Sequence, residues 1–273
     1  MWPRGLLALV LVALATATAG AAPRRVVSLN PSLTATIVAL GAGEVLVGVD
    51  AWSAERQPAV RDRPTVGGLF TPSLEAVVAL QPDLVVLVPS VQQRDLRDRL
   101  RGLGIEVLEL PNLSLDDLLV SIERLGKRLG RGEAAARRVS EIRRAFATPA
   151  PVSRPPRALL VIQREPLYVA GAGSFLDAML RAAGARNVAA GFAEPYPRVD
   201  LEWAIAAQPE VILDATEAGE PADRFWARWP SLPAVGAGRV LAIPADEVIL
   251  PGPEVDGGVG VLREALHPGG ASP

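Results

Sequence analysis

The sequence predicts an α/β protein of two similar lobes that are joined by helix. Three observations carry this prediction. The segment SLEAVVALQPDLVV, which begins at Ser73, returns in related form as DLEWAIAAQPEVIL from Asp200. In both halves of the chain, short apolar runs of strand length alternate with helix-periodic runs, which is the pattern of a parallel α/β layer. Between the halves, residues 131–148 are helix-periodic and lack the Gly/Ser composition of a flexible linker.

The first lobe is predicted over residues 23–130. It begins with a strand at 26–29, a loop that contains NPS, a helix over 33–40 that stops at Gly41, and a strand at 45–50. The first copy of the repeat then gives a helix that is capped by Ser73 and ends before Pro82. A strand at 83–88, a helix over 94–103 and a strand at 105–110 complete the lobe.

The linking segments and the second lobe follow the same rules. Residues 114–130 and 131–147 are both helix-periodic, and in the latter Ala135, Val139, Ile142 and Phe146 share one face. The second lobe is predicted over 149–268, with strands at 158–162 and 167–170, a helix over 174–184, a repeat helix capped by Asp200 and a strand at 210–215. Residues 269–273 are predicted to form a tail.

The composition excludes several classes of protein. A chain of 273 residues with 49% hydrophobic residues is large and apolar enough for real cores, so general disorder is excluded. A net charge of −2 supplies no basic field for nucleic acid. The three tryptophans of the second repeat region, Trp203, Trp226 and Trp229, are expected to be packing residues.

The first 22 residues have the layout of a cleaved secretory signal. Arg4 precedes an apolar run from Leu6 to about Ala15, and the small residues of 19–22 follow it. An uncleaved anchor is the alternative. The chain has no cysteine, so it has neither a disulfide framework nor a lipid-accepting cysteine after the signal. We therefore expect a periplasmic, monomeric protein whose mature chain starts near Pro23.

Residues suited to catalysis are scarce, and no catalytic or metal-binding residue is predicted. The single histidine, His267, is expected to be an ordinary surface residue. Glu75 and Glu202 occupy equivalent places in the two repeats, where the helix dipole favours an anion in the first turn of a helix. A glycosidase-like pair would need carboxyl groups within about 10 Å, and equivalent positions on two lobes are expected to lie farther apart than that.

Three aromatic residues lie in predicted loops beside strand ends, where parallel sheets form ligand crevices. They are Trp52, Phe70 and Tyr196. Ser32, Gly173 and Asp246 are further candidate ligand-binding residues. For Gly173, in the sequence GAGS, the alternative is an ordinary turn before a capping box formed by Ser174 and Asp177.

The sequence also resembles a known family. The segments RVVSLNPSLTATIVALGAGEVLVGVDAWS, VGGLFTPSLEAVVALQPDLVV, AGAGSFLDAMLRAAGARNV and SLPAVGAGRVLAIP resemble helical-backbone (class III) periplasmic substrate-binding proteins of ABC importers. These proteins serve cobalamin, haem and ferric siderophores. The resemblance implies two α/β lobes bridged by one long backbone helix, with the ligand in the cleft between them.

The resemblance gives the repeated glutamates a role. In this family, a glutamate on the outer surface of each lobe docks onto arginines of the membrane permease, and Glu75 and Glu202 match those positions. A pseudo-symmetric binding protein placed on a two-fold symmetric permease must present the same anion twice. This implies an inner-membrane permease as the partner.

Within the family the cobalamin branch is the most similar, because Trp52 and Tyr196 match cleft aromatics of that branch. The branch has a further tryptophan where this chain has Val88, and many members have an arginine pair where it has Leu250 and Glu254. The resemblance therefore implies cobalamin or a related corrinoid as cargo and no resident cofactor. Haem or a ferric siderophore is the alternative ligand, and a secreted enzyme or an envelope scaffold is the alternative class of protein.

Overall fold

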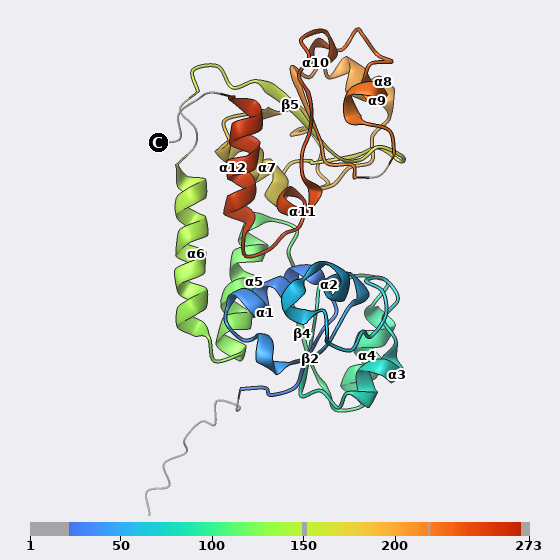
Figure 1. The fold of residues 1–273 in the computed structure, drawn as a ribbon, viewed down its shortest axis with the longest axis vertical. Helices are drawn as coiled ribbons and strands as arrows, with labels where there is room; N and C mark the ends of the chain where they lie inside the picture. Colours follow the sequence, from blue (N-terminus) through green and yellow to red (C-terminus); the bar gives the residue numbers. More distant parts are fainter. Residues whose placement is uncertain (1–21, 149–151, 218, 269–273) are drawn as a thin grey trace, which may run out of the picture.

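Two α/β lobes are stacked along the long axis of the molecule, and helix α6 runs beside the gap between them (Figure 1). The computed structural model describes residues 22–148, 152–217 and 219–268. The predicted fold class is confirmed. The predicted signal segment, apart from Ala22, and the predicted tail lie outside the described residues. Within the described part of the chain, no helix is both long and apolar enough to span a bilayer.

The first lobe is built on a four-stranded parallel sheet in the order β2-β1-β3-β4. Its strands are β1 (Val26–Ser28), β2 (Leu46–Val49), β3 (Leu84–Leu87) and β4 (Glu106–Glu109). Its helices are α1 (Pro31–Ala39), α2 (Ala51–Arg56), α3 (Leu74–Ala79) and α4 (Arg94–Gly102), with 3-10 turns η1 (Gly43–Val45) and η2 (Pro58–Val60). Alternate residues of β1 and β3 enter two different apolar clusters, so both faces of the sheet are covered.

The second lobe is built on a five-stranded sheet in the order β6-β5-β8-β9, with β7 also pairing with β5. Its strands are β5 (Arg157–Gln163), β6 (Tyr168–Val169), β7 (Arg186–Asn187), β8 (Val211–Asp214) and β9 (Val240–Ala242), of which β6 alone is antiparallel to its neighbour. Its helices are α7 (Phe175–Ala182), α8 (Leu201–Ala206), α9 (Ala222–Trp226), α10 (Pro233–Gly236), α11 (Ala245–Val248) and α12 (Val255–Leu266). Trp226 is fully buried, which confirms its expected packing role.

Helices α5 (Leu115–Arg128) and α6 (Gly132–Ala147) connect the lobes. The 16 residues of α6 span about 24 Å, and the helix reaches from the first lobe to the flank of α12 (Figure 1). Ala135, Val139 and Ile142 are buried on its inner face as predicted, and Phe146 packs beside them. The arginine Arg138 of this helix pairs with Asp256 of α12.

The sequence repeat is also a structural repeat. The Ser73 hydroxyl accepts a hydrogen bond from Ala76 N at 3.1 Å, and the Asp200 carboxylate accepts one from Trp203 N at 2.7 Å, so both predicted N-caps are confirmed. Two residues after the last residue of each helix stands a glutamine with a left-handed backbone, with φ of 45° at Gln81 and 46° at Gln208. The proline after each glutamine prevents the helix from continuing. Both lobes therefore start a helix, stop it and turn into the next strand in the same way.

Candidate functional site

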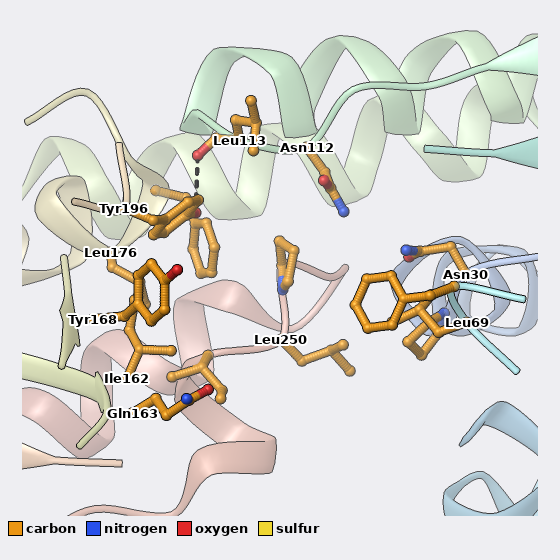
Figure 2. Close-up of a pocket in the computed structure, with 15 residues that line it drawn as sticks. Asn30, Leu69, Asn112, Leu113, Ile162, Gln163, Tyr168, Leu176, Tyr196 and Leu250 are labelled. Carbon is orange, nitrogen blue, oxygen red and sulfur yellow. Dashed lines mark hydrogen bonds between the residues drawn. The ribbon is translucent and has the colours of Figure 1, made fainter. Parts of the chain in front are cut away.

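A cavity of about 540 Å³ lies between the two lobes. It is lined by residues of both lobes and of the segment that crosses between them. These residues are Asn30, Pro31, Leu69, Phe70, Asn112, Leu113, Ile162, Gln163, Tyr168, Phe175, Leu176, Tyr196, Ile249, Leu250 and Pro251. Figure 2 shows Asn30 and Leu69 on one side, facing Tyr168 and Tyr196 on the other. No charged side chain is among these residues. The cavity therefore suits a broad ligand with large apolar surfaces and few charges.

The cavity lies where strands of both sheets end. Asn30 follows β1 and caps α1, because its side-chain oxygen accepts a hydrogen bond from Ser32 N at 3.0 Å. Gln163 closes β5 in the second lobe. Ligands of parallel α/β sheets bind at the carboxyl ends of the strands. In both lobes these strand ends face the cavity.

The floor of the cavity is the segment before α5. The carbonyl oxygen of Leu113 accepts one hydrogen bond from Phe175 N at 3.0 Å and another from the Tyr196 hydroxyl at 3.2 Å. Phe175 and Tyr196 also meet edge to face, with ring centroids 6.5 Å apart. Burial, and to a lesser extent the negative charge of Asp117, raises the pKa of Tyr196. Its phenol therefore stays protonated and donates this hydrogen bond across the lobes.

Two of the six predicted ligand-binding residues line the cavity. Phe70 comes from the first lobe and is 70% exposed, so its ring is accessible to a ligand. Tyr196 comes from the second lobe. The two rings therefore approach the cavity from opposite lobes.

Trp52 and Asp246 come together outside the lining of this cavity. Trp52 lies in helix α2 and not in the loop that we expected, because Asp50 accepts a hydrogen bond from Ser53 N at 3.0 Å and starts a helix there. The Arg56 guanidinium lies 4.4 Å from the centre of the Trp52 ring. It pairs with Asp246 at 2.7 Å and with Glu217 at 3.2 Å. The hydrogen bonds to Asp246 and then to Glu217 raise the pKa of Arg56.

Ser32 and Gly173 are also absent from the lining residues. Ser32 is buried, and its hydroxyl donates to the carbonyl of Pro251, so it joins the lobes directly. Gly173, with φ of 75°, turns the chain into α7 beside open space. Ser174 caps that helix as predicted, but the Asp177 carboxylate accepts a hydrogen bond from Asn187 at 3.0 Å, so only the Ser174 half of the expected capping box forms.

Most of the remaining lining residues had no signal in the sequence. Asn30 is the exception, because an asparagine between a strand and a helix is a recognisable N-cap. Tyr168 follows the turn after β5, and Figure 2 shows its hydroxyl pointing toward the middle of the cavity. Leu113 and Leu250 are ordinary apolar residues whose role depends on how the lobes meet.

Glu75 and Glu202 are exposed in the first turns of α3 and α8, and neither lines the cavity. Figure 1 places these helices in different lobes, both on the side of the molecule away from α6. Hydrogen bonds from its own backbone N–H and then from Ser73 lower the pKa of Glu75, so this carboxylate is ionised at neutral pH.

The described residues offer few groups for metal binding. Within ranges 22–148, 152–217 and 219–268, no three His, Cys, Asp or Glu side chains gather closely enough to hold an ion. His267, expected to be an ordinary surface residue, is half-buried and lies 3.1 Å from the carbonyl oxygen of Ala183. The ring lies directly after α12, where the carbonyl oxygen of Ala183, the residue after α7, can accept a hydrogen bond from it.

Comparison with known proteins places the chain among solute-binding proteins. The family described as periplasmic binding protein matches residues 26–247. The cobalamin-binding protein of Halobacterium salinarum is 30% identical over 260 residues, which cover 90% of this chain and 70% of that protein. The crystal structure of the periplasmic vitamin B12-binding protein BtuF of Vibrio cholerae superposes with a TM-score of 0.73 at 25% identity, covering 90% of this chain and 97% of that one. A periplasmic haem-binding protein of Pseudomonas aeruginosa superposes with a TM-score of 0.74 at 28% identity, covering 90% and 94%.

Proposed function

The chain belongs to the periplasmic binding protein family, and from this premise we propose that it captures cobalamin or a related corrinoid and delivers it to an ABC permease of the inner membrane. The observation that carries the proposal is the cavity between the lobes, which is aromatic and apolar and has no charged side chain in its lining. A corrinoid presents a wide, largely neutral macrocycle edged by amides. Aromatic faces and the side-chain amides of Asn30, Asn112 and Gln163 suit both parts of such a ligand.

The names of relatives support the same ligand. Both the Halobacterium salinarum relative and the Vibrio cholerae structure are named for cobalamin or vitamin B12. The ligand is cargo, and we propose no resident cofactor. We also propose that the protein has no catalytic activity, since the cavity has no nucleophile paired with a base in its lining.

Haem is the second candidate, and a specific observation favours it. The Tyr168 hydroxyl points into the cavity (Figure 2) and has no hydrogen-bond partner among the described residues. A phenolate oxygen is a possible axial ligand for haem iron. Against haem, the cavity lining offers no arginine or lysine for the two propionates.

A titration separates the two ligands. Purified protein without residues 1–22 is mixed with cyanocobalamin or with hemin, and absorbance and tryptophan fluorescence are followed. We expect saturable fluorescence quenching by cyanocobalamin at one ligand per protein and no iron–phenolate absorbance band with hemin. Tight hemin binding that is lost in Tyr168→Phe would instead establish the second candidate.

Delivery is proposed to depend on Glu75 and Glu202. Both carboxylates are exposed, and they belong to equivalent helices of the two lobes. The double variant Glu75→Arg, Glu202→Arg should retain ligand affinity and lose permease-dependent uptake, because each attraction to a permease cation becomes a repulsion. Normal uptake by the double variant would exclude the docking role, and a loss of ligand affinity would indicate a structural role instead.

Export is proposed to use the first 22 residues as a cleaved signal, which leaves a periplasmic mature chain that starts near Pro23. Mass spectrometry of the protein from the periplasm measures the new N-terminus. An intact Met1 in a membrane fraction would establish the uncleaved anchor instead.

A further inference from the structure

Arg56 joins the two lobes beside the cavity. Its guanidinium belongs to α2 of the first lobe, and both of its carboxylate partners belong to the second lobe. The Nη1 atom donates to Asp246 Oδ2 at 2.7 Å, and the Nη2 atom donates to Glu217 Oε2 at 3.2 Å. The two acids come from different elements, because Asp246 lies in the first turn of α11 and Glu217 follows β8. A movement of one lobe away from the other must therefore break both ion pairs.

Contacts within each lobe support Arg56 and the segment that carries Glu217. The buried Asp50 caps α2 and fixes the helix that carries Arg56, and the Trp52 ring supports the guanidinium from one side. On the opposite lobe, the buried carboxylate of Asp214 accepts a hydrogen bond from Thr216 N at 3.0 Å, directly before Glu217. Because Arg56 and the segment before Glu217 are already supported, forming the ion pairs orders fewer rotamers than pairing free surface side chains would.

The group is linked to the cavity wall in both lobes. The side chain of Gln57, next to Arg56, donates to the carbonyl oxygen of Pro31 at 3.0 Å, and Pro31 lines the cavity. Helix α11, which carries Asp246, runs into the lining residues 249–251. Opening at Arg56 therefore affects the cavity wall in both lobes.

The other contacts between the lobes differ in kind. Ser32 with Pro251, and Tyr196 with Leu113, are neutral hydrogen bonds. The pair of Arg138 with Asp256 lies on α6, the helix about which the lobes are joined. Among the described residues, the ion pairs between a sheet-flanking helix of the first lobe and the second lobe are those of Arg56. The contribution of Arg56 is therefore measured by comparing the salt response of wild type with that of a variant that lacks Arg56.

We propose that Arg56, Asp246 and Glu217 form an ionic clasp that holds the lobes together over bound ligand and slows its release. The inference rests on the proposed function for the identity of the ligand. Arg56 acts as a positioning residue, since neither it nor its partners line the cavity. Trp52 and Asp246, which the sequence marked as candidate ligand contacts, thereby gain a different role in the same process.

Release kinetics test the clasp. Protein loaded with cyanocobalamin is mixed with an excess of unloaded wild-type protein, and the release rate is measured at about 20 mM and about 500 mM salt. We expect Arg56→Gln to release the ligand about three- to tenfold faster than wild type at low salt, because two partly exposed ion pairs are lost. We also expect salt to accelerate release from wild type and to have little effect on the variant.

The matched control is Arg101→Gln, which removes an ion pair at 2.8 Å to Glu109 within the first lobe and should leave release unchanged. A charge-swapped variant that combines Arg56→Glu with Asp246→Arg can form an ion pair of reversed polarity. In a Glu217→Gln background, this variant should release the ligand more slowly than Arg56→Gln does. Wild-type release that does not respond to salt, or Arg56→Gln release at the wild-type rate, would overturn the clasp.

A second measurement needs no ligand, so it separates failure of the clasp from failure of the proposed function. The chain has no cysteine, and spin labels can be attached at Arg61→Cys and Asp223→Cys, one exposed position in each lobe. Distances from pulsed electron resonance should lengthen or broaden in Arg56→Gln and remain as in wild type in Arg101→Gln. Identical distributions in all three proteins would refute the clasp, even if cyanocobalamin does not bind.

Discussion

Replacing Gly171 by alanine should disturb both the stability of the second lobe and the ligand site. The Cβ atom of an alanine at this position would lie 2.3 Å from the carbonyl oxygen of Glu194 and 2.6 Å from Cδ of Pro197. Real Cβ contacts stay above 3.0 Å, so the 194–197 segment must move by at least 0.7 Å. That segment carries Tyr196, and Gly171 N is already bonded to the carbonyl of Pro195 at 2.9 Å.

The magnitude follows from two terms. Overpacking against backbone costs about 1–3 kcal/mol. The Tyr196 hydrogen bond to Leu113, already at 3.2 Å, is lengthened or lost, which costs about 0.5–1.5 kcal/mol more. A total of about 1.5–4.5 kcal/mol corresponds to a fall of roughly 3–18 °C in melting temperature for a chain of this size. Because the Tyr196 ring shifts in the cavity, cyanocobalamin affinity should fall about three- to thirtyfold.

Calorimetry measures both quantities on the same samples. The matched control is Gly191→Ala, which is in the same lobe and has no heavy atom within 4 Å of the new Cβ. The control should melt and bind as wild type does. If Gly171→Ala and Gly191→Ala have equal melting temperatures and equal affinities, the close backbone approach does not position Tyr196.

Asp214→Asn leaves the buried Arg164 charge, now 2.8 Å from Asp214, without its partner. Urea unfolding should show a loss of about 3–5 kcal/mol, and a loss below about 1 kcal/mol would contradict the role of this ion pair. Burial raises the pKa of Asp50, so its contribution to the free energy of unfolding is present at acid pH and is lost as pH rises above the ordinary value of 3.8 through the raised value. Stability measured against pH should therefore fall less steeply in Asp50→Asn, and parallel curves would refute this. Phe70→Ala and Tyr196→Ala should each weaken cyanocobalamin binding by about 1–3 kcal/mol in calorimetry, and unchanged affinity in both would remove them from the site.

The fold could be predicted from local signals that the structure preserves. Ser73 and Asp200 are N-caps whose side chains need only their own helices, and the prolines after Gln81 and Gln208 end those helices whatever the tertiary context. The inner face of α6 followed from helical periodicity. Such signals depend on neighbours within a few residues, so one sequence suffices to read them.

The site could be predicted only in part, because it forms between segments that are distant in the chain. Phe70 and Tyr196 were found because they are aromatic residues in loops beside strand ends, where parallel sheets form ligand crevices. The ion pair of Arg56 with Asp246 joins positions 190 residues apart, and no sequence signal near either residue predicts it. Gly171 matters through its closeness to the 194–197 segment, whereas the sequence drew attention to Gly173, which faces open space.

Equilibrium dialysis with radiolabelled cyanocobalamin tests the central claim most directly. The protein without residues 1–22 should retain one cyanocobalamin per chain, an equimolar amount of hemin should not displace it, and Phe70→Ala should retain less at the same free ligand concentration. No retention of cyanocobalamin, or its displacement by equimolar hemin, would contradict the account of an uncharged interlobe cavity built for a corrinoid.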